Sequence, residues 1–326
     1  MKTVIIHRHE FNSAADLLRS GGLVAFPTET VYGLGADATN PQAVARIFEA
    51  KQRPEFDPLI VHVADLASAS LAVTEFPKAA RILANELWPG PLTLVLPKTS
   101  QIPDLVTSGL PGVGLRIPNH PIALELLKLA NLPIAAPSAN PFGRISPTTV
   151  EHVLQGLDGR IDMVVDGGPC SIGLESTVIS FMEREPLVLR PGGCPIEVIE
   201  NLIGTVRIAA SDPSRDDQAQ PAPGMLSRHY APQLELQIVP RNTSARPKAG
   251  RKTGLLTYGN QPFSGRFDQV EVLSADDNLQ TCAAKFFAAL RCLDSERLDV
   301  IIAHEFPARG LGIALNDRLR RAACRG

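Results

Sequence analysis

The sequence has little of what marks several large classes of protein. Its 326 residues include only five cysteines, an odd number with no C-x-x-C pair, which argues against a disulfide framework and against a zinc site. No apolar run approaches the roughly 18–20 residues that cross a bilayer. The first residues lack the apolar core and the cleavage site of a signal peptide. We therefore expect a reduced cytoplasmic protein that does not enter a membrane.

The chain also lacks an excess of positive charge. Its formal net charge is -2, whereas a protein that binds nucleic acid along a broad face is usually basic. We therefore expect weak or no direct nucleic-acid binding. Hydrophobic residues make up 44% and charged residues 20%, an ordinary balance for a folded globular chain. A chain of 326 residues is longer than one core usually serves, so we expect two domains.

The familiar nucleotide-binding motifs are missing. The string nearest to G-x-x-x-x-G-K-[ST] is Gly250-Arg251-Lys252-Thr253, which lacks the first glycine and the Gly-Lys order. Gly33-Leu34-Gly35-Ala36-Asp37-Ala38 has the spacing of G-x-G-x-x-A, but we expect no strand to run directly into it. We interpret its glycines as a tight turn. No protein motif for a metal is found, and no organic cofactor is expected.

What the sequence does contain is an alternation of strand-like and helix-like segments. Pro41–Lys51 has apolar residues at the spacing of one helix face, with Asn40 as N-cap and proline at the first helical position. Further helices are expected at Pro77–Leu87, Pro121–Ala130 and Pro147–Leu157, and strands at Leu23–Phe26, Leu59–Val63, Leu92–Leu96, Val113–Ile117, Ile134–Ala136, Met163–Val165, Thr177–Phe181 and Leu187–Leu189. This interleaving predicts an α/β or α+β domain with a mixed sheet.

The composition changes after residue 208. Residues 209–233 are rich in Ser, Asp, Gln, Pro and Ala, which is typical of a linker. The end of this linker contains His229 and Tyr230, which a pure spacer does not need, so we expect it to fold over the active site. A second, small α/β (Rossmann-like) domain is expected over 234–326, with 1–208 as the first domain. Its expected strands are Leu234–Val239, Gly254–Thr257, Val270–Leu273 and Val300–Ala303, and its helices Asp277–Leu293 and Ile313–Ala323.

Four cations stand at the ends of predicted elements. Lys51 and Arg53 end a helix and precede two prolines that stiffen the turn. They complement the helix dipole, and they also offer the fixed donors that a phosphate or carboxylate site needs. Arg116 and Arg190 lie in otherwise apolar strands and need an anionic partner. The four cations either form structural salt bridges or together bind a ligand with a triphosphate and a second ligand with a carboxylate.

Small or polar side chains lie in or at the ends of several predicted strands. They are Thr28, Thr30, His62, Ala136, Ser138, Asn140 and Ser176. Thr28 or Thr30 could simply cap a helix, and a lone strand histidine is more often structural. Small residues such as Ala136 let a ligand approach the backbone. Ser146 is expected as the N-cap of the helix at Pro147, whose first amides could receive a phosphate.

The chain resembles the YrdC/Sua5 family in several motifs that occur in the same order. These are Pro27-Thr28-Glu29-Thr30-Val31-Tyr32-Gly33-Leu34, Lys51-x-Arg53, Ser138-x-Asn140, Glu175-Ser176-Thr177 and Leu189-Arg190-Pro191-Gly192. The segment His229-Tyr230-Ala231-Pro232 and the second α/β domain resemble the longer, two-domain Sua5 branch. The resemblance covers nearly the whole chain.

The resemblance implies an L-threonylcarbamoyladenylate synthase, a nucleotidyltransferase that makes threonylcarbamoyl-AMP and pyrophosphate from L-threonine, bicarbonate and ATP. It implies a twisted mixed sheet with helices around a concave, positively charged cavity. The product serves the first step of tRNA threonylcarbamoyladenosine (t6A) biosynthesis, so tRNA-modification partner proteins are expected, and Mg²⁺ is expected with ATP.

Site residues follow from the same resemblance. Threonine would be bound by Thr30, His62, Arg116, Ala136 and Ser176. ATP would be bound by Arg53, Asp57, Ser138, Asn140, Ser146, Arg190 and Tyr230. Lys51 and Arg53 are the expected catalytic residues. Position 57 usually has an asparagine in the family, and here it is Asp57. The aspartate keeps a hydrogen-bond acceptor, loses the amide donor and adds a negative charge.

Two other functions remain as alternatives. A carbamoyl transferase of the hydrogenase-maturation type contains a similar domain, but it should also carry zinc-finger and acylphosphatase-like parts, and this chain has no C-x-x-C. A non-catalytic RNA-binding protein is the second alternative, against which the acidic charge balance argues.

Overall fold

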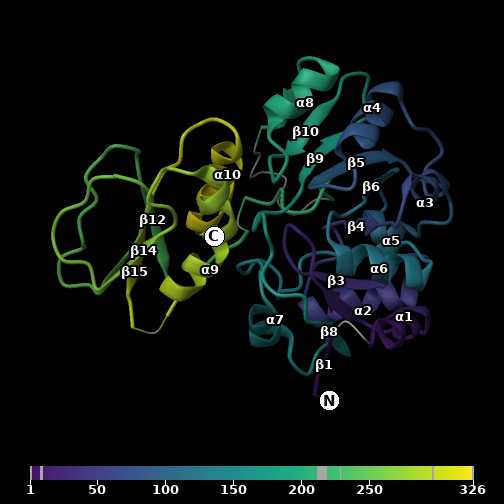
Figure 1. The fold of residues 1–326 in the computed structure, drawn as a ribbon, viewed down its shortest axis with the longest axis horizontal. Helices are drawn as coiled ribbons and strands as arrows, with labels where there is room; N and C mark the ends of the chain where they lie inside the picture. The colour runs from purple at the N-terminus through teal and green to yellow at the C-terminus, as the bar shows by residue number, and fades with distance from the viewer. Residues whose placement is uncertain (1, 8–9, 211–218, 228, 296, 325–326) are drawn as a thin grey trace.

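The computed structural model describes residues 2–7, 10–210, 219–227, 229–295 and 297–324, and two sheets organise them (Figure 1). The large sheet contains β1 (Val4–Ile6), β2 (Val24–Phe26), β3 (Gly33–Asp37), β4 (Ile60–His62), β5 (Leu92–Pro97), β6 (Gly112–Arg116), β7 (Ile134–Ala135), β8 (Met163–Val165), β9 (Thr177–Ser180), β10 (Leu187–Arg190) and β11 (Arg207–Ile208). Their order is β1-β8-β2-β3-β7-β4-β6-β5-β9-β10-β11. The sheet contains both parallel pairs such as β4–β6 and antiparallel pairs such as β5–β6, which confirms the predicted mixed sheet.

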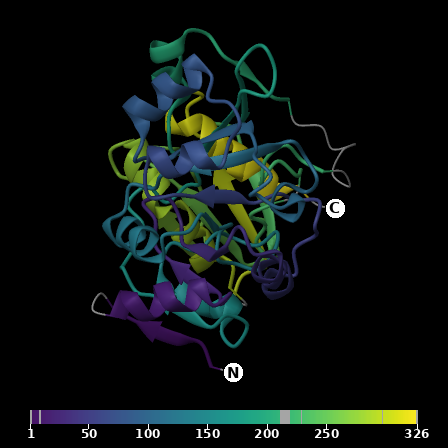
Figure 2. The same cartoon turned by 90° about the vertical axis from the view of Figure 1, so that its right-hand side faces the viewer.

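Helices cover both faces of the large sheet (Figures 1 and 2). They are α1 (Phe11–Arg19), α2 (Pro41–Lys51), α3 (Leu66–Leu71), α4 (Lys78–Leu87), α5 (Asp104–Thr107), α6 (Pro121–Ala130), α7 (Val150–Leu157) and α8 (Ile196–Ile203). Apolar side chains of α1 and α6 form one core with β2, whereas those of α2, α4 and α7 pack into a second core. The central strands of the sheet are thus buried on both sides, whereas the edge strands β1 and β11 have exposed residues.

Helix α2 forms as its sequence predicts. The Asn40 side chain accepts hydrogen bonds from the backbone amides of Gln42 and Ala43, and Pro41 occupies the first turn. The helix ends at Gln52, whose φ of 54° is left-handed and turns the chain toward Arg53. Because Lys51 lies in the last turn and on the inner face, this stop buries its side chain.

The small sheet is entirely parallel and has the order β12-β15-β13-β14. It consists of β12 (Glu235–Val239), β13 (Thr253–Thr257), β14 (Gln269–Val272) and β15 (Val300–His304), and it is followed in the chain by α10 (Leu311–Ala323), with α9 (Leu279–Leu293) between β14 and β15. Figure 1 shows α9 and α10 on the side of this sheet that faces the large sheet. Among the described residues, no helix is both long and apolar enough to span a membrane.

The two sheets share a continuous apolar interface. Val31, Ile145 and Leu174 from the first part of the chain belong to the same core cluster as Phe287 of α9. Gly173 makes the close approach of α9 possible, because a Cβ atom there would lie 2.5 Å from the Ala283 carbonyl oxygen. The helical side of the small sheet is therefore packed directly against the part of the large sheet where the predicted site residues lie.

Three local predictions are wrong. Gly33 and Gly35 lie within β3, not in a tight turn, and a Cβ atom at Gly35 would come within 2.8 Å of the Phe26 ring. The segment Thr28–Tyr32 forms no capped helix, since the Thr28 hydroxyl accepts from the amides of Thr30 and Val31 within a turn.

The third correction concerns Ser146. Helix α7 begins at Val150, and its N-cap is Thr149, whose side chain accepts from the His152 amide. Ser146 therefore caps no helix, because residues 147–149 separate it from the first helical residue. Its hydroxyl donates a hydrogen bond to Glu175.

Candidate active site

A cavity lies where several strands of the large sheet end, and the segment of residues 221–227 and 229–230, here called the strap, runs across it. Nine predicted site residues line the cavity: Thr30, Arg53, His62, Arg116, Ala136, Ser138, Ser176, Arg190 and Tyr230. The register of the sheet explains the convergence, because His62 at the end of β4 pairs with Arg116 at the end of β6. Residues 54 positions apart in sequence thus meet as neighbours.

The other four predicted residues, Lys51, Asp57, Asn140 and Ser146, lie behind the cavity wall. Lys51 Nζ donates hydrogen bonds to the carbonyl oxygens of Ser138 and Asn140, which fixes the loop that presents Ser138. The Asn140 side-chain amide donates to the carbonyls of Pro141 and Arg144 at 2.8 and 2.9 Å. Burial, reinforced by Arg53, lowers the pKa of Lys51 well below its ordinary value.

At one end of the cavity, here called the Arg116 end, a single cation is already paired. Arg116 Nη2 lies 2.7 Å from Glu29 Oε1, and both side chains are at most 5% exposed. Burial and the charge of Arg116 lower the pKa of His62 to about 3, so its ring is neutral at physiological pH. The hydroxyls of Thr28 and Thr30 lie 2.8 Å apart. This end offers a guanidinium and hydroxyls in a space without excess charge.

The opposite end, here called the Arg53 end, has more cations than carboxylates. Arg53 Nη2 contacts Asp57 Oδ2 at 2.9 Å and also donates to the Pro58 carbonyl at 2.7 Å. Arg190 lies in the same wall, with Nη2 donating to the Ser176 carbonyl at 2.9 Å. Burial lowers the pKa of both arginines, and that of Asp57 is raised by burial against the opposing effect of its cationic neighbours. Buried positive charge of this kind is suited to a polyanion.

The strap closes the Arg53 end. Arg190 Nη1 donates to the Pro223 carbonyl at 2.8 Å, and the Tyr230 ring packs at 5.7 Å from the Phe287 ring of α9. Gly224 has a φ of 76°, and a Cβ atom there would lie 2.5 Å from the Tyr230 hydroxyl. Burial and four nearby cations lower the pKa of His229 well below its ordinary value. The strap is therefore held both by the large sheet and by the second domain.

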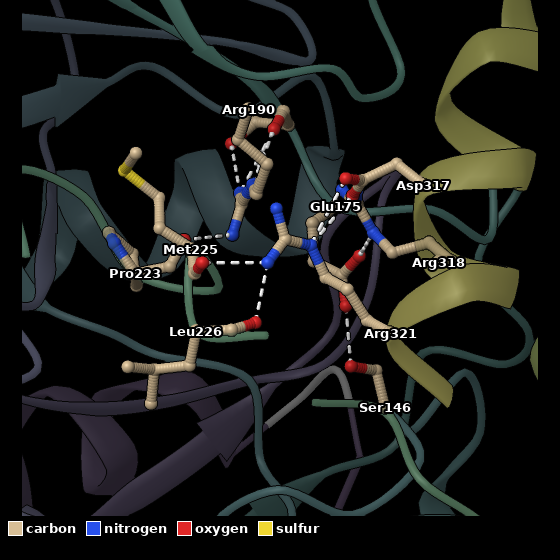
Figure 3. Close-up of polar contacts among 10 residues, drawn as sticks. Ser146, Glu175, Arg190, Pro223, Met225, Leu226, Asp317, Arg318 and Arg321 are labelled. Atoms are coloured by element: carbon tan, nitrogen blue, oxygen red, sulfur yellow. Dashed lines mark hydrogen bonds and ion pairs between the residues drawn. The ribbon is translucent and has the colours of Figure 1, made fainter. Parts of the chain in front are cut away.

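Two residues in contact with the site, Arg318 and Arg321, were missed by the sequence analysis, and Glu175 was named there only as part of a motif (Figure 3). Glu175 lines the cavity, and Arg318 Nε of α10 donates to its Oε2 at 2.7 Å. Arg321 Nη1 donates to the strap carbonyls of Met225, at 2.7 Å, and Leu226. A signal was present, because Arg318 interrupts the apolar face that Ala314 and Ala322 define at intervals of four residues.

Comparison with known proteins agrees with this geometry. The Sua5/YciO/YrdC family model, described as telomere recombination, matches residues 16–192, and a model described as the C-terminal domain of threonylcarbamoyl-AMP synthase matches residues 195–324. The threonylcarbamoyl-AMP synthase of Pyrococcus abyssi is 44% identical over 98% of this chain and 95% of the relative. That of Bacillus subtilis is 45% identical over 95% of this chain and 92% of the relative.

A solved structure extends the likeness to three dimensions. The crystal structure of P. abyssi Sua5 in complex with L-threonine superimposes with a TM-score of 0.90 at 41% identity, and it covers 99% of this chain and 98% of that chain. Because both domains match in sequence and in structure, the likeness includes the docking of the second domain. The chain therefore belongs to the Sua5/YciO/YrdC family, in the two-domain Sua5 branch whose members are named threonylcarbamoyl-AMP synthase.

Proposed function

We propose that this enzyme makes threonylcarbamoyl-AMP and pyrophosphate from L-threonine, bicarbonate and ATP, and that the cavity under the strap is its active site. The carrying observation is the division of one cavity into an Arg116 end, where the cation is paired, and an Arg53 end, where cations are in excess. A small amino acid fits the first kind of environment and a triphosphate the second. Full-length likeness to threonylcarbamoyl-AMP synthases favours this activity over a carbamoyl transferase or an RNA-binding protein.

Threonine binds at the Arg116 end. The Arg116 guanidinium takes the carboxylate, and Glu29 holds the guanidinium in place. Thr30 and Ser176 offer hydroxyls, and neutral His62 can accept or donate without adding charge. Ala136 leaves room for the ligand beside the backbone.

ATP binds at the Arg53 end. Arg53 and Arg190 contact the triphosphate, Ser138 donates from the adjoining loop, and Tyr230 covers the nucleotide from the strap. The predicted residues behind the wall act through these groups. Asp57 orients Arg53, Lys51 and Asn140 fix the loop of Ser138, and Ser146 holds Glu175.

The reaction needs positioning and charge compensation more than a protein nucleophile. The threonine amine, after losing a proton, attacks the carbon of bicarbonate, and water leaves to give a carbamate. A carbamate oxygen then attacks the α-phosphorus of ATP, and the bond to the bridging oxygen of pyrophosphate breaks. Both partners are anions, so Arg53 and Arg190 offset their repulsion and the charge on the leaving group. The strap shields the labile anhydride from water.

Magnesium is expected as part of the ATP substrate. Among the described residues, no group of three or more His, Cys, Asp or Glu side chains could hold a metal ion. The carboxylates at the Arg53 end, Asp57 and Glu175, are paired with arginines. Such a site suits Mg²⁺, which prefers phosphate oxygens and retained water and would neutralise charge on the triphosphate.

A product assay tests the activity. The purified protein is incubated with labelled bicarbonate, threonine, ATP and magnesium, and the products are separated by chromatography. We expect threonine-dependent formation of labelled threonylcarbamoyl-AMP together with pyrophosphate. The rate should fall at least about 100-fold in Arg53→Ala, which loses charge stabilisation, and in Lys51→Ala, which loses the loop geometry. ATP binding without this product would overturn the proposal.

The domain roles and the cellular setting follow from the same proposal. Residues 1–208 form the catalytic domain, 209–233 the linker that contains the strap, and 234–326 the second domain. The product is an activated anhydride, so it passes to tRNA-modifying partner proteins in the first step of t6A synthesis. All five cysteines are free, which supports the reducing cytoplasm as the place of action.

A further inference from the structure

One arginine of the second domain lies directly behind the wall of the cavity, in contact with two of its lining residues. Arg318 of α10 is fully buried, and its Nε donates to Glu175 Oε2 at 2.7 Å (Figure 3). Glu175 lines the cavity, and its other carboxylate oxygen accepts from Ser146. The guanidinium carbon of Arg318 also lies 5.0 Å from the centre of the Tyr230 ring. A single side chain of the second domain thus contacts both a wall residue and the strap.

The charges around Arg318 are balanced only while this arginine is present. Arg318 Nη1 lies 2.5 Å from Asp317 Oδ2, and Asp317 is also paired with Arg321 at 3.1 Å. Burial lowers the pKa of Arg318, but Tyr230, Glu175 and Asp317 together outweigh burial and raise it above its ordinary value. Arg318 thus contacts both carboxylates, Glu175 and Asp317. Removing Arg318 would leave Asp317 paired with Arg321, whereas Glu175 would lose the arginine that contacts it and keep only the hydroxyl of Ser146 as a contact.

We propose that Arg318 is a positioning residue of the ATP site, through which the second domain makes the cavity able to bind ATP. It cancels the negative charge of Glu175, which would otherwise face the triphosphate, and it holds Tyr230 over the nucleotide. Arg318 reaches the substrate through these two residues. The inference rests on the proposed function in one respect, the placement of ATP at the Arg53 end.

The position of Glu175 explains why its charge must be cancelled. Glu175 lines the cavity, and its charge acts to raise the pKa of Arg190, so its carboxylate lies near a cation of the Arg53 end. In a buried wall, a carboxylate without a partner repels an anion strongly, because little water screens it. A paired carboxylate does not. Glu175 can then hold Ser146 without weakening the attraction of Arg53 and Arg190 for phosphate.

Four variants of the full-length protein test the proposal: Arg318→Met, Glu175→Gln, the double variant and Arg318→Lys. Binding of a non-hydrolysable ATP analogue with magnesium, and separately of threonine, is measured by calorimetry. We expect Arg318→Met to weaken analogue binding at least about 30-fold, since a buried charge is left unpaired, and threonine binding less than about threefold. Adding Glu175→Gln should restore analogue binding to within about fivefold of the original protein, because both charges are then gone.

Each outcome of these measurements either supports or overturns the proposed role of Arg318. A double variant no better than Arg318→Met, or equal loss of ATP-analogue and threonine binding, would overturn the proposal and leave Arg318 a packing residue. If Arg318→Met does not fold, Arg318→Lys and the double variant carry the test, and Arg318→Lys should bind the analogue with an intermediate affinity because it keeps charge but loses the planar fork. Arg320→Met is the matched control, since Arg320 is exposed on the same helix. This variant should bind the ATP analogue with the affinity of the original protein.

Failure of the proposed function is distinguishable from failure of this inference. If the unmodified protein binds the ATP analogue but forms no threonylcarbamoyl-AMP, the proposed reaction is wrong, and the four binding constants still test Arg318. If the product forms and the analogue affinities do not differ, the reaction stands and the role of Arg318 is refuted.

Discussion

Each end of the cavity contains a buried arginine–glutamate pair, and the two pairs are built differently. Arg116 and Glu29 lie 2.7 Å apart at the Arg116 end, and both come from the first domain. Arg318 and Glu175 also lie 2.7 Å apart, but they join α10 of the second domain to the wall of the Arg53 end. The first pair joins the end of β6 to the segment between β2 and β3 within one domain, whereas the second exists only while the domains are docked. Similar local chemistry therefore depends on two different levels of structure.

Among the variants that test this comparison, Arg116→Met should have the largest effect on ligand affinity. The change removes the cation that we assign to the threonine carboxylate and leaves Glu29 without its partner. Threonine affinity should fall about 100-fold, since a buried charge-assisted contact is lost and an unpaired carboxylate remains, whereas binding of the ATP analogue should change less than threefold. Titration calorimetry with each ligand checks the split. An equal loss for both ligands would mean that the two ends are not separate sites.

Gly224→Ala should disturb the Arg53 end and raise the KM for ATP about 20-fold. A Cβ atom at this position would meet the Tyr230 hydroxyl at 2.5 Å and Arg190 Nη1 at 2.9 Å, and the left-handed φ adds strain. We expect the KM for ATP to rise about 20-fold and that for threonine to stay nearly constant, because the displaced groups belong to the Arg53 end, where we propose that ATP binds. Steady-state kinetics with each substrate varied in turn measures the difference.

Gly204→Ala provides the matched control for Gly224→Ala. Gly204 also has a left-handed φ, of 84°, but a Cβ atom there would meet no atom within 4 Å. Gly204→Ala therefore introduces backbone strain without a clash between the new Cβ atom and a neighbouring side chain. A similar rise in the KM for ATP in both variants would show that strain alone causes the effect, and the proposed role of Tyr230 and Arg190 in ATP binding would lose this support.

The smallest expected effect concerns pH and the Arg116 end. The pKa of His62 is about 3 in the folded protein because of burial and the nearby Arg116, against an ordinary value of 6.5. Between these values the unfolded chain binds a proton that the folded protein does not, so acid destabilises the fold. His62 alone should contribute a slope of about 1.4 kcal/mol per pH unit to the free energy of unfolding.

Urea unfolding between pH 4 and 6 measures this contribution. In His62→Gln the decline of stability with falling pH should be shallower by that amount, and His152, whose pKa is lowered to about 4 by burial and by Arg291, should still contribute its own slope. His7→Gln serves as the control, because His7 is exposed. An unchanged slope in His62→Gln would indicate that the ring is already protonated in the fold.

Much of this architecture could be predicted from local patterns. The N-cap Asn40 with Pro41 defined the start of α2, and runs such as Leu92–Leu96 gave strands because apolar alternation and length are local properties. Predictions failed where tertiary packing set the conformation. Gly35 lies in a strand because Phe26 and Ile134 fill the space beside it, and α1 was missed because its short apolar face is completed only by α6.

The candidate site shows the same division. The motifs identified nine residues that line the cavity, since strand ends of an α/β sheet are where side chains converge. They did not distinguish Arg53, which lines it, from Lys51 and Asp57, which lie behind it. That distinction depends on the left-handed stop at Gln52 and on the path of the neighbouring loop.

The sequence by itself determined the family, the order of elements and the kinds of side chain that meet at strand ends, because these depend on motif, periodicity and residue chemistry. Only the tertiary structure decided which groups face the cavity and which charges cancel. Arg318 lies 143 positions from Glu175 along the chain, and no local pattern relates them. Their pairing follows from the docking of α9 and α10 against the large sheet, which Gly173 permits by leaving room for the helix backbone.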